Sequence, residues 1–466
     1  MQEMIKDMAQ ALGYVYKQTT EQPVTGLAVD SRAVQQGDLF VALVGEQTDG
    51  HKYLQQALER GAAAVVISRP EQVALEQLSD YIIVEDGLKF IQQLAHWLRS
   101  KTQIPVIAVT GSVGKTSTKD FLAALLASLG PIVVTKGNNN NELGLPLTIC
   151  RLAADTKALV VEMGMRGLGQ IDFLCQIAQP DYGLITNIGK THCELLGSQE
   201  NIAQAKCELL PYIKAGCVVA LNKKDEHFLQ PWLSTCKGDI LWYNADGAAD
   251  LWASDIVQND DGIQYVLHYG DHTQPIQLPV QGVHNVSNSL AAIAIAHTLG
   301  VTWEQVDTCL RQAKLTGMRL DTTVNAQGVT VINDTYNANP DSMKSAIAVL
   351  MQKKGRRKIA VLGDMYELGR YEEESHREVG AYAAAQSVDY VIAVGQLGRL
   401  IGDAAEEAGC LVSRAETNEQ AMQLLSRYVQ TGDVILVKGS RGMKMEQIVQ
   451  EIMGLNYVAD RLSLFD

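Results

Sequence analysis

The chain has 466 residues, of which 47% are hydrophobic and 20% charged. This composition is typical of a soluble globular protein, and the length is enough for about three domains. Lys and Arg total 39 against 53 Asp and Glu, so the formal net charge is −14. Such a charge repels phosphate backbones and excludes general nucleic-acid binding and a polybasic membrane anchor, although a local cationic site for a small anion stays possible.

Cysteine usage and apolar segments indicate the compartment. The eight cysteines are scattered without a CxxC pair, so neither a zinc site nor a disulfide framework is indicated, and a reducing environment is expected. The N-terminal MQEMIKDMAQ carries acidic residues where a signal peptide needs a basic start. The most apolar window, residues 290–296, is far shorter than the roughly 18 residues of a membrane span. We therefore expect a cytoplasmic protein without membrane insertion.

Strand-like runs alternate with helical patterns along nearly the whole chain, which favours an α/β fold with parallel sheets. Three segments are distinguished, residues 1–103, 104–315 and 316–466. The third segment repeats the alternation and indicates a doubly wound, Rossmann-like sheet. The clearest expected strands are residues 39–45, 62–68, 80–86, 104–110, 329–334, 358–364, 389–395 and 433–439.

A phosphate-binding loop is indicated at residues 111–117. The expected strand 104–110 leads into GSVGKTS, and an apolar helical stripe that starts with Phe121 follows. In this context the glycines let backbone N–H groups converge on phosphate oxygens, the lysine reaches the terminal phosphates, and the next threonine hydroxyl can hold Mg²⁺. The candidate nucleotide-binding residues are Gly111, Ser112, Val113, Gly114, Lys115, Thr116 and Ser117. Val109 stands where the common GxxxxGK(S/T) motif has its first glycine, which argues against a generic GTPase or motor ATPase.

Further polar residues follow the expected strands or lie on helices. Glu162 ends the apolar run ALVVE, where a carboxylate could hold Mg²⁺ or simply cap a strand at the surface. Asn285 and Asn288 share one helix face and could pair with an adenine edge, although Asn285 could instead be an N-cap. Considered alone, Lys206 is typical of an exposed helical lysine and His192 of a hydrogen-bonded loop residue.

The basic run KKGRRK at residues 353–358 invites a nucleic-acid interpretation. It lies between a helical pattern and a buried strand, and the whole chain is acidic, so a solvated turn is favoured.

In combination, TGSVGKTS, GNNNNELGLPLT (137–148), VVEMGMRGLGQI (160–171), TNIGKTHCELLGS (186–198) and HNVSNSLAA (284–292) resemble the Mur ligases. These are the ATP-dependent amino-acid-adding enzymes of peptidoglycan precursor synthesis. The segments DSRAVQQGDLFVAL (30–43) and DGHKYLQQALERGA (49–62) are similar to the two later-acting members. NDTYNANPDSM (333–343) and VLGDMYELG (361–369) look like the member that adds a dipeptide, and the DNPR-type signature of the third-residue ligase is absent.

The resemblance implies a domain for each participant: residues 1–103 for the UDP-linked substrate, 104–315 for ATP and 316–466 for the ligase domain that swings onto the second. It implies that D-alanyl-D-alanine is joined to a UDP-N-acetylmuramoyl-tripeptide through an acyl phosphate, with Mg²⁺, by a monomer. The third-residue ligase is the main alternative. A folylpolyglutamate-type ligase and a non-catalytic nucleotide-binding module are also considered. An oxidoreductase is disfavoured because no GxGxxG follows a strand.

The resemblance also implies residue roles. Lys206, carbamylated by CO₂, and His192 would hold a second Mg²⁺, Arg319 would reach the ATP phosphates, and Lys115 would act with them in catalysis. Asn138 would approach the phosphates, and Asp334, which follows a strand, would bind the ribose of ATP. The expected substrate-binding residues are Ser31 and Arg32 for the UDP portion, with DSR as a plain turn being the alternative, and Asn139, Asn337, Asn339, Lys438, Ser440 and Arg441 for the peptides.

Overall fold

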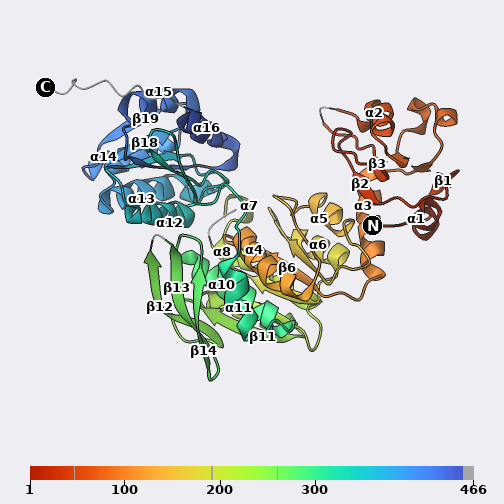
Figure 1. Ribbon diagram of the computed structural model, residues 1–466, viewed down its shortest axis with the longest axis horizontal. Helices are drawn as coiled ribbons and strands as arrows, with labels where there is room; N and C mark the ends of the chain where they lie inside the picture. Colours follow the sequence, from red (N-terminus) through yellow and green to blue (C-terminus); the bar gives the residue numbers. More distant parts are fainter. Residues whose placement is uncertain (47, 190–192, 260, 455–466) are drawn as a thin grey trace.

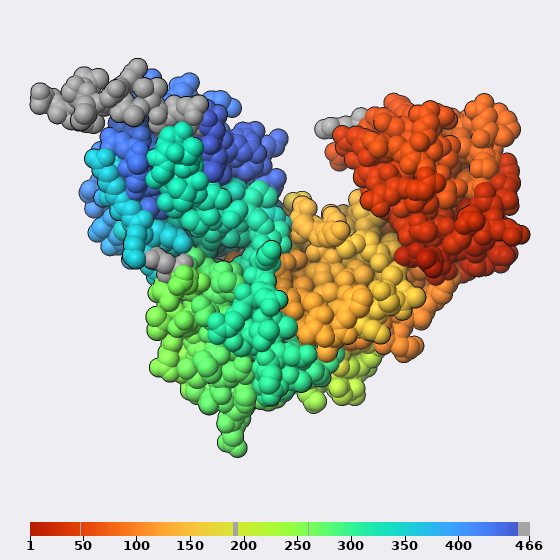
Figure 2. All heavy atoms as spheres, viewed as in Figure 1, coloured from red at the N-terminus to blue at the C-terminus, as the bar shows by residue number. Residues whose placement is uncertain are grey.

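The structure is a computed structural model that describes residues 1–46, 48–189, 193–259 and 261–454. It contains three sheets, each with its own covering helices, and the three α/β units are separate in Figure 1. In Figure 2 a deep hollow separates the first unit, coloured red, from the last, coloured blue. The fold is therefore the expected three-unit α/β architecture.

The first unit is a five-stranded sheet in the order β1-β5-β4-β3-β2, with only β1 antiparallel to its neighbour. Phe40 and Ile67 pack on one face, and Leu39 packs with Phe90 and Leu94 of α3 on the other. The elements are α1 (Ile5–Leu12), β1 (Val15–Lys17), β2 (Gly26–Ala28), β3 (Asp38–Val41), α2 (Leu54–Glu59), β4 (Ala64–Ile67), β5 (Tyr81–Ile83) and α3 (Gly87–Ser100).

Helix α3 joins the first unit to the second. Its Phe90 and Leu94 belong to the same apolar cluster as Leu145 and Leu174 of the central unit. At its end the buried Arg99 donates to the carbonyls of Ala178 and Gln179 and forms a 2.8 Å ion pair with Asp181. These contacts fix the first unit on the central one.

The central unit is a nine-stranded sheet in the order β14-β13-β12-β11-β10-β9-β6-β8-β7. Strands from β7 through β12 are parallel, whereas β12, β13 and β14 form an antiparallel meander. The strands are β6 (Val106–Thr110), β7 (Ile132–Val134), β8 (Ala158–Glu162), β9 (Tyr182–Ile185), β10 (Val218–Asn222), β11 (Asp239–Asn244), β12 (Leu251–Asn259), β13 (Gly262–Tyr269) and β14 (His272–Leu278). The antiparallel extension lies outside the expectation of a parallel central sheet. It arises because the short connection after Tyr269 can join only antiparallel strands.

Helices cover both faces of the central sheet. Leu122 and Leu125 of α4 pack with Leu290 and Ile293 of α10 on one face, while α5, α6 and α8 lie on the other. The helices are α4 (Lys115–Leu126), α5 (Gly144–Ile149), α6 (Gln170–Ala178), α7 (Cys193–Leu196), α8 (Gln199–Cys207), α9 (Glu226–Leu229), α10 (His284–Thr298) and α11 (Trp303–Arg311).

The third unit is a six-stranded sheet in the order β15-β16-β20-β17-β18-β19, parallel except for β15. Separate apolar clusters fill its two faces, so helices cover both sides of the sheet. Its elements are β15 (Asp321–Val324), β16 (Thr330–Asn333), α12 (Pro340–Gln352), β17 (Lys358–Gly363), α13 (Glu372–Ala385), β18 (Tyr390–Val394), α14 (Gly398–Glu407), β19 (Val412–Ala415), α15 (Asn418–Tyr428), β20 (Val434–Lys438) and α16 (Glu446–Gly454).

Two further features concern the surface. The basic run 353–358 forms the turn between α12 and β17, where Arg357 makes a 2.6 Å ion pair with the buried Asp433. Within the described ranges, no helix combines the length and apolar character needed to cross a bilayer.

Candidate active site

The predicted phosphate loop connects β6 to α4. Gly111 and Gly114 have φ angles of 147° and 81°, and Gly114 is the N-cap of α4. A Cβ at Gly111 would lie 1.8 Å from Thr186 Oγ1, and one at Gly114 would lie 2.3 Å from Asn288 Oδ1. Only glycine fits both the backbone angles and the space at these positions. The N-terminus of α4 therefore opens onto a cradle that suits an anion.

The polar residues after β9 hold this loop in place. Asn187 Oδ1 accepts from the Val113 N–H at 3.0 Å, and its Nδ2 donates to the Val113 carbonyl at the same distance. The Thr186 hydroxyl donates to that carbonyl too. The backbone carbonyl of Asn187 accepts from the Ser112 N–H. The loop is thus fixed before any ligand is bound.

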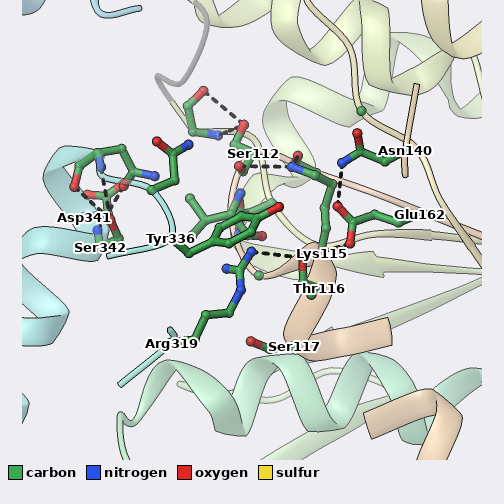
Figure 3. A pocket seen from close by; sticks show the side chains of 18 of the residues that line it. Ser112, Lys115, Thr116, Ser117, Asn140, Glu162, Arg319, Tyr336, Asp341 and Ser342 are labelled. Carbon is green, nitrogen blue, oxygen red and sulfur yellow. Dashed lines mark hydrogen bonds between the residues drawn. The ribbon is translucent and has the colours of Figure 1, made fainter. Parts of the chain in front are cut away.

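Lys115 and Thr116 begin α4 beneath the loop (Figure 3). Lys115 Nζ donates to the Gly111 carbonyl at 2.7 Å. Burial lowers the pKa of Lys115, and the cation of Arg319 lowers it further, while Glu162 opposes this. A polyphosphate would remove this penalty by supplying negative charge beside the lysine.

Glu162 forms a buried oxygen cluster with Thr116 at the end of β8. The Thr116 hydroxyl donates to Glu162 Oε2 at 2.8 Å, and Asn140 Nδ2 donates to Oε1 at 2.8 Å. Glu162 is 2% exposed, so the interpretation as a surface strand cap is wrong. In the described part of the chain no group of three or more His, Cys, Asp or Glu side chains is arranged to hold a metal ion. A hydroxyl and a carboxylate beside a phosphate site are ligands that suit Mg²⁺.

Arg319 reaches the loop from the linker between the second and third units, residues 312–320. Its Nη2 donates to Thr116 Oγ1 at 3.0 Å, and its guanidinium lies 4.1 Å from the ring centroid of Tyr336. The Arg319 Nε is buried and has no hydrogen-bond partner among the described residues. Arg319 and Tyr336 lie beside Thr116 in Figure 3. A cation with an unused donor next to the phosphate loop fits an anionic ligand.

Asn285 and Asn288 occupy one face of α10 above the loop. Asn288 Nδ2 donates to Asn285 Oδ1 at 2.9 Å, and Asn285 Nδ2 donates to the Gln281 carbonyl. Because α10 begins at His284 with Val283 as its N-cap, the alternative role of Asn285 as N-cap is wrong. The pair is buried at the cleft wall, where an amide could meet a base edge.

Lys206 is buried in α8, with a residue exposure of 1%. The expectation of an exposed helical lysine is therefore wrong. Burial lowers the pKa of Lys206 well below its usual range, and Lys115 lowers it further. The residue lines the same cleft as the phosphate loop. His192, its expected partner, lies outside the described residues.

The third unit contributes residues from two strand ends. Lys438, at the end of β20, forms a 2.6 Å ion pair with Asp334 and donates to the Asn337 carbonyl. Asn339 is the N-cap of α12, and its Oδ1 accepts from the Ser342 N–H. Two other predicted residues lie close by. The Ser440 hydroxyl accepts from the Tyr366 N–H, and Arg441 forms a 3.0 Å ion pair with Glu446.

These residues line one cleft of about 1700 Å³ between the central and third units. The predicted residues that line it are residues 111–117, Asn138, Glu162, Lys206, Asn285, Asn288, Arg319, Asp334, Asn337, Asn339, Lys438, Ser440 and Arg441. Sequence reasoning did not single out Asn187, His284 and Tyr336, which also line it, and it included Asn140 only within the asparagine run 138–141. Asn187 could have been predicted from its position just after a strand.

Three predicted substrate residues do not line this cleft. Asn139 is exposed in the loop after β7. Ser31 donates to Gln56 Oε1 at 2.7 Å, and Arg32 pairs with Asp30 at 2.7 Å. The Ala33 N–H donates to the Asp30 carbonyl, so DSR forms a turn in the first unit.

Residues 109–296 match the Mur ligase middle domain, residues 318–441 the Mur ligase glutamate ligase domain, and residues 23–98 the Mur ligase family catalytic domain. The chain belongs to the Mur ligase family. As expected of this family, it is an ATP-dependent ligase.

Similar proteins agree over nearly the whole chain. UDP-N-acetylmuramoyl-tripeptide–D-alanyl-D-alanine ligase from Bacillus subtilis is 38% identical and covers 94% of each chain. A crystal structure of MurF from Acinetobacter baumannii has a TM-score of 0.85 at 31% identity and covers 97% of this chain and 99% of that one. MurF from Thermotoga maritima in complex with ADP has a TM-score of 0.78 at 28% identity and covers 92% of this chain and 98% of the other.

Proposed function

We propose that this Mur ligase joins D-alanyl-D-alanine to a UDP-N-acetylmuramoyl-tripeptide while converting ATP to ADP and phosphate. The bond from Arg319 of the linker to Thr116 of the phosphate loop supports a ligase in which the third unit completes the ATP site. The substrate pair is inferred from relatives such as the D-alanyl-D-alanine ligase of Bacillus subtilis, which aligns with this chain over 94% of its own length. In domain terms we assign the UDP-linked substrate to residues 1–103, ATP to 104–315 and the incoming dipeptide to 316–466.

The chemistry requires activation of a carboxylate, because a free carboxylate and an amine form only a salt at neutral pH. A terminal carboxylate oxygen of the tripeptide attacks the γ-phosphorus, the bond to the β-phosphate oxygen breaks, and ADP leaves. The neutral amine of the dipeptide then attacks the acyl carbon, and the tetrahedral intermediate expels phosphate and releases one proton. Catalysis of this kind depends on positioning and charge stabilisation.

The chain's own cations meet this need. Lys115 and the N-terminus of α4 face the phosphate cradle, and Arg319 places a second cation at Thr116. When bound, Mg²⁺ would screen charge between the phosphate oxygens, with Thr116 and Glu162 as its protein ligands. Asp334 at the end of β16 would bind the ribose, and Asn285 with Asn288 the adenine.

Lys206 is proposed to be carbamylated. Only a neutral amine reacts with CO₂, and the lowered pKa of Lys206 keeps more of this amine neutral. The reaction would form an N–C bond, release a proton and replace a penalised cation near Lys115 by an anion. The carbamate would then be a ligand for a second Mg²⁺, with His192 as the expected partner.

The residues proposed to bind the peptides and the UDP portion lie in the first unit, the loop after β7 and the third unit. We propose that Asn138 approaches the ATP phosphates. The residues proposed to face the peptide substrates are Asn139, Asn337, Asn339, Lys438, Ser440 and Arg441. Ser31 and Arg32 would hold the UDP portion, which requires Arg32 to exchange its bond with Asp30 for a pyrophosphate. We further propose a monomer that acts in the cytoplasm, and light scattering at two protein concentrations tests the monomer.

Phosphate release tests the function. Purified protein with ATP, Mg²⁺ and UDP-N-acetylmuramoyl-tripeptide is expected to release phosphate only when D-alanyl-D-alanine is added, with the joined product seen by mass spectrometry. Turnover that instead needs the dipeptide precursor and a diamino acid would assign the third-residue activity. Tight ATP binding without turnover in either mixture would leave only the nucleotide site.

A further inference from the structure

The linker that carries Arg319 is attached to α4 at a second point. Asp120 Oδ2 accepts from the Thr316 N–H at 2.7 Å and from the Thr316 hydroxyl at 2.8 Å. Asp120 Oδ1 lies 2.5 Å from Lys119 Nζ, and the Asp120 side chain is 10% exposed. Oδ2 of Asp120 therefore holds the linker, and Oδ1 contacts one buried cation.

The two attachment points lie on one face of α4. Thr116 and Asp120 are four residues apart, so their side chains are neighbours on the helix. Thr316 and Arg319 contact them in the opposite order, because Thr316 meets Asp120 and Arg319 meets Thr116. The linker thus runs back along the helix toward the phosphate loop and delivers Arg319 there.

The backbone on either side of Arg319 shows that this path is imposed. Met318 and Leu320 have φ angles of 62° and 54°, values uncommon for residues other than glycine. The Met318 carbonyl accepts from the Tyr336 N–H, which ties the other end of the linker to the third unit. A strained turn persists only where the surrounding contacts determine it, and Thr316 supplies the contact on the side of α4.

We propose that Asp120 is a positioning residue that sets Arg319 on the phosphate site by anchoring Thr316. The inference rests on the proposed function, in which Arg319 stabilises the transferring phosphate. Asp120 itself faces the linker rather than the substrate. Its removal should therefore act only through Arg319.

A double-mutant cycle between Asp120 and Arg319 tests this coupling. D120A is expected to lower kcat about tenfold, in keeping with the loss of hydrogen bonds to a charged group. In the R319A background the same substitution is expected to change kcat less than about twofold, because residues that act as a unit are not additive. The proposal is overturned if D120A lowers log kcat in the R319A background by more than half of its effect in the unsubstituted enzyme. It is also overturned if D120A alone leaves kcat unchanged.

Variants at Thr316 keep the test independent of the folding of D120A. T316V removes the hydroxyl donor and is expected to lower kcat about threefold, whereas T316S keeps both donors and is expected to retain the activity. Equal losses in T316V and T316S would overturn the proposal. D307A is the matched control, since Asp307 of α11 accepts from the Gln277 N–H and pairs with Arg311; it is expected to leave kcat unchanged.

The same cycle is measured in the affinity for ATP with Mg²⁺ by isothermal titration calorimetry. This readout does not depend on which peptide is the substrate. A protein that couples Asp120 to Arg319 in ATP affinity but releases no phosphate with D-alanyl-D-alanine would contradict the proposed function alone. Additive effects in both readouts, with normal turnover, would contradict the positioning role alone.

Discussion

Lys438 Nζ lies 2.6 Å from Asp334 Oδ2, and both residues are buried at the ends of the adjacent strands β16 and β20. The ion pair neutralises the lysine that was expected to face a substrate carboxylate. The same pair orients Asp334 at the cleft wall, beside the expected position of the ribose, so a substrate carboxylate at Lys438 would share the lysine with Asp334.

Loss of this lysine should leave a buried carboxylate without its cation. K438M is expected to lower the free energy of unfolding by about 3 kcal/mol, since breaking a buried pair leaves an unpaired charge. Adding D334N should recover part of the loss because it removes that charge. Urea denaturation of the two variants and the unsubstituted protein checks both. A K438M protein as stable as the unsubstituted one would contradict the importance of the pair.

Glu162 should control the response to Mg²⁺. E162Q keeps the shape of the side chain but removes the negative charge that Thr116 and Asn140 now contact. We expect kcat to fall on the order of 10²-fold and the half-saturating Mg²⁺ concentration to rise. Phosphate release measured across Mg²⁺ concentrations tests this, with the surface substitution E304Q on α11 as control. An unchanged Mg²⁺ response would remove Glu162 from the metal site.

The buried Lys206 should make stability depend on pH in buffer free of CO₂. Burial lowers its folded-state pKa well below the ordinary 10.5, so the protonated amine is disfavoured in the folded state. The resulting cost is present below the folded pKa, decreases as pH rises from that value, and vanishes near the unfolded value. K206M lacks this cost, so its excess stability over the unsubstituted protein should be large at pH 7 and shrink as pH approaches 10. A gap that grows with pH would contradict the assignment.

The carbamylation of Lys206 has its own test. Added bicarbonate should restore activity to protein prepared in CO₂-free buffer, and it should have no effect on K206M. Native mass spectrometry should show the gain of one CO₂ in the active protein only. Full activity of the CO₂-free protein would exclude a role for the carbamate.

Substitution of Gly114 should weaken nucleotide binding. In G114A the new Cβ would meet Asn288 Oδ1 at 2.3 Å, and the φ angle of 81° is strained for alanine. We expect ATP affinity to fall at least about tenfold, because the loop must shift. G216A is the matched control: Gly216 has a φ angle of 80° and open space around its Cβ position. Equal losses of affinity in both variants would point to backbone strain as a general cause.

Local patterns predicted most of this fold and part of the site. The strand, loop and helix around Lys115 follow from a contiguous motif, and Glu162 follows from its place at a strand end. Considered alone, Lys206 was typical of an exposed helical lysine, and only the family resemblance placed it at the site. Its burial depends on how α8 packs on the central sheet rather than on neighbouring residues. Tyr336 and Asp120 were missed for a related reason, since their contacts with the linker join residues that are 17 and 196 positions apart in sequence.

The position of β6 in the central sheet bears on when the site can form during synthesis. This strand pairs with β8 and β9, which end at Glu162 and Ile185, so the strand before the phosphate loop has neighbours on both sides only after both have been made. The loop is then held by Asn187, and Thr116 meets Arg319 only after the linker has emerged. A nascent or truncated chain that ends before the linker therefore lacks the second cation at the phosphate site.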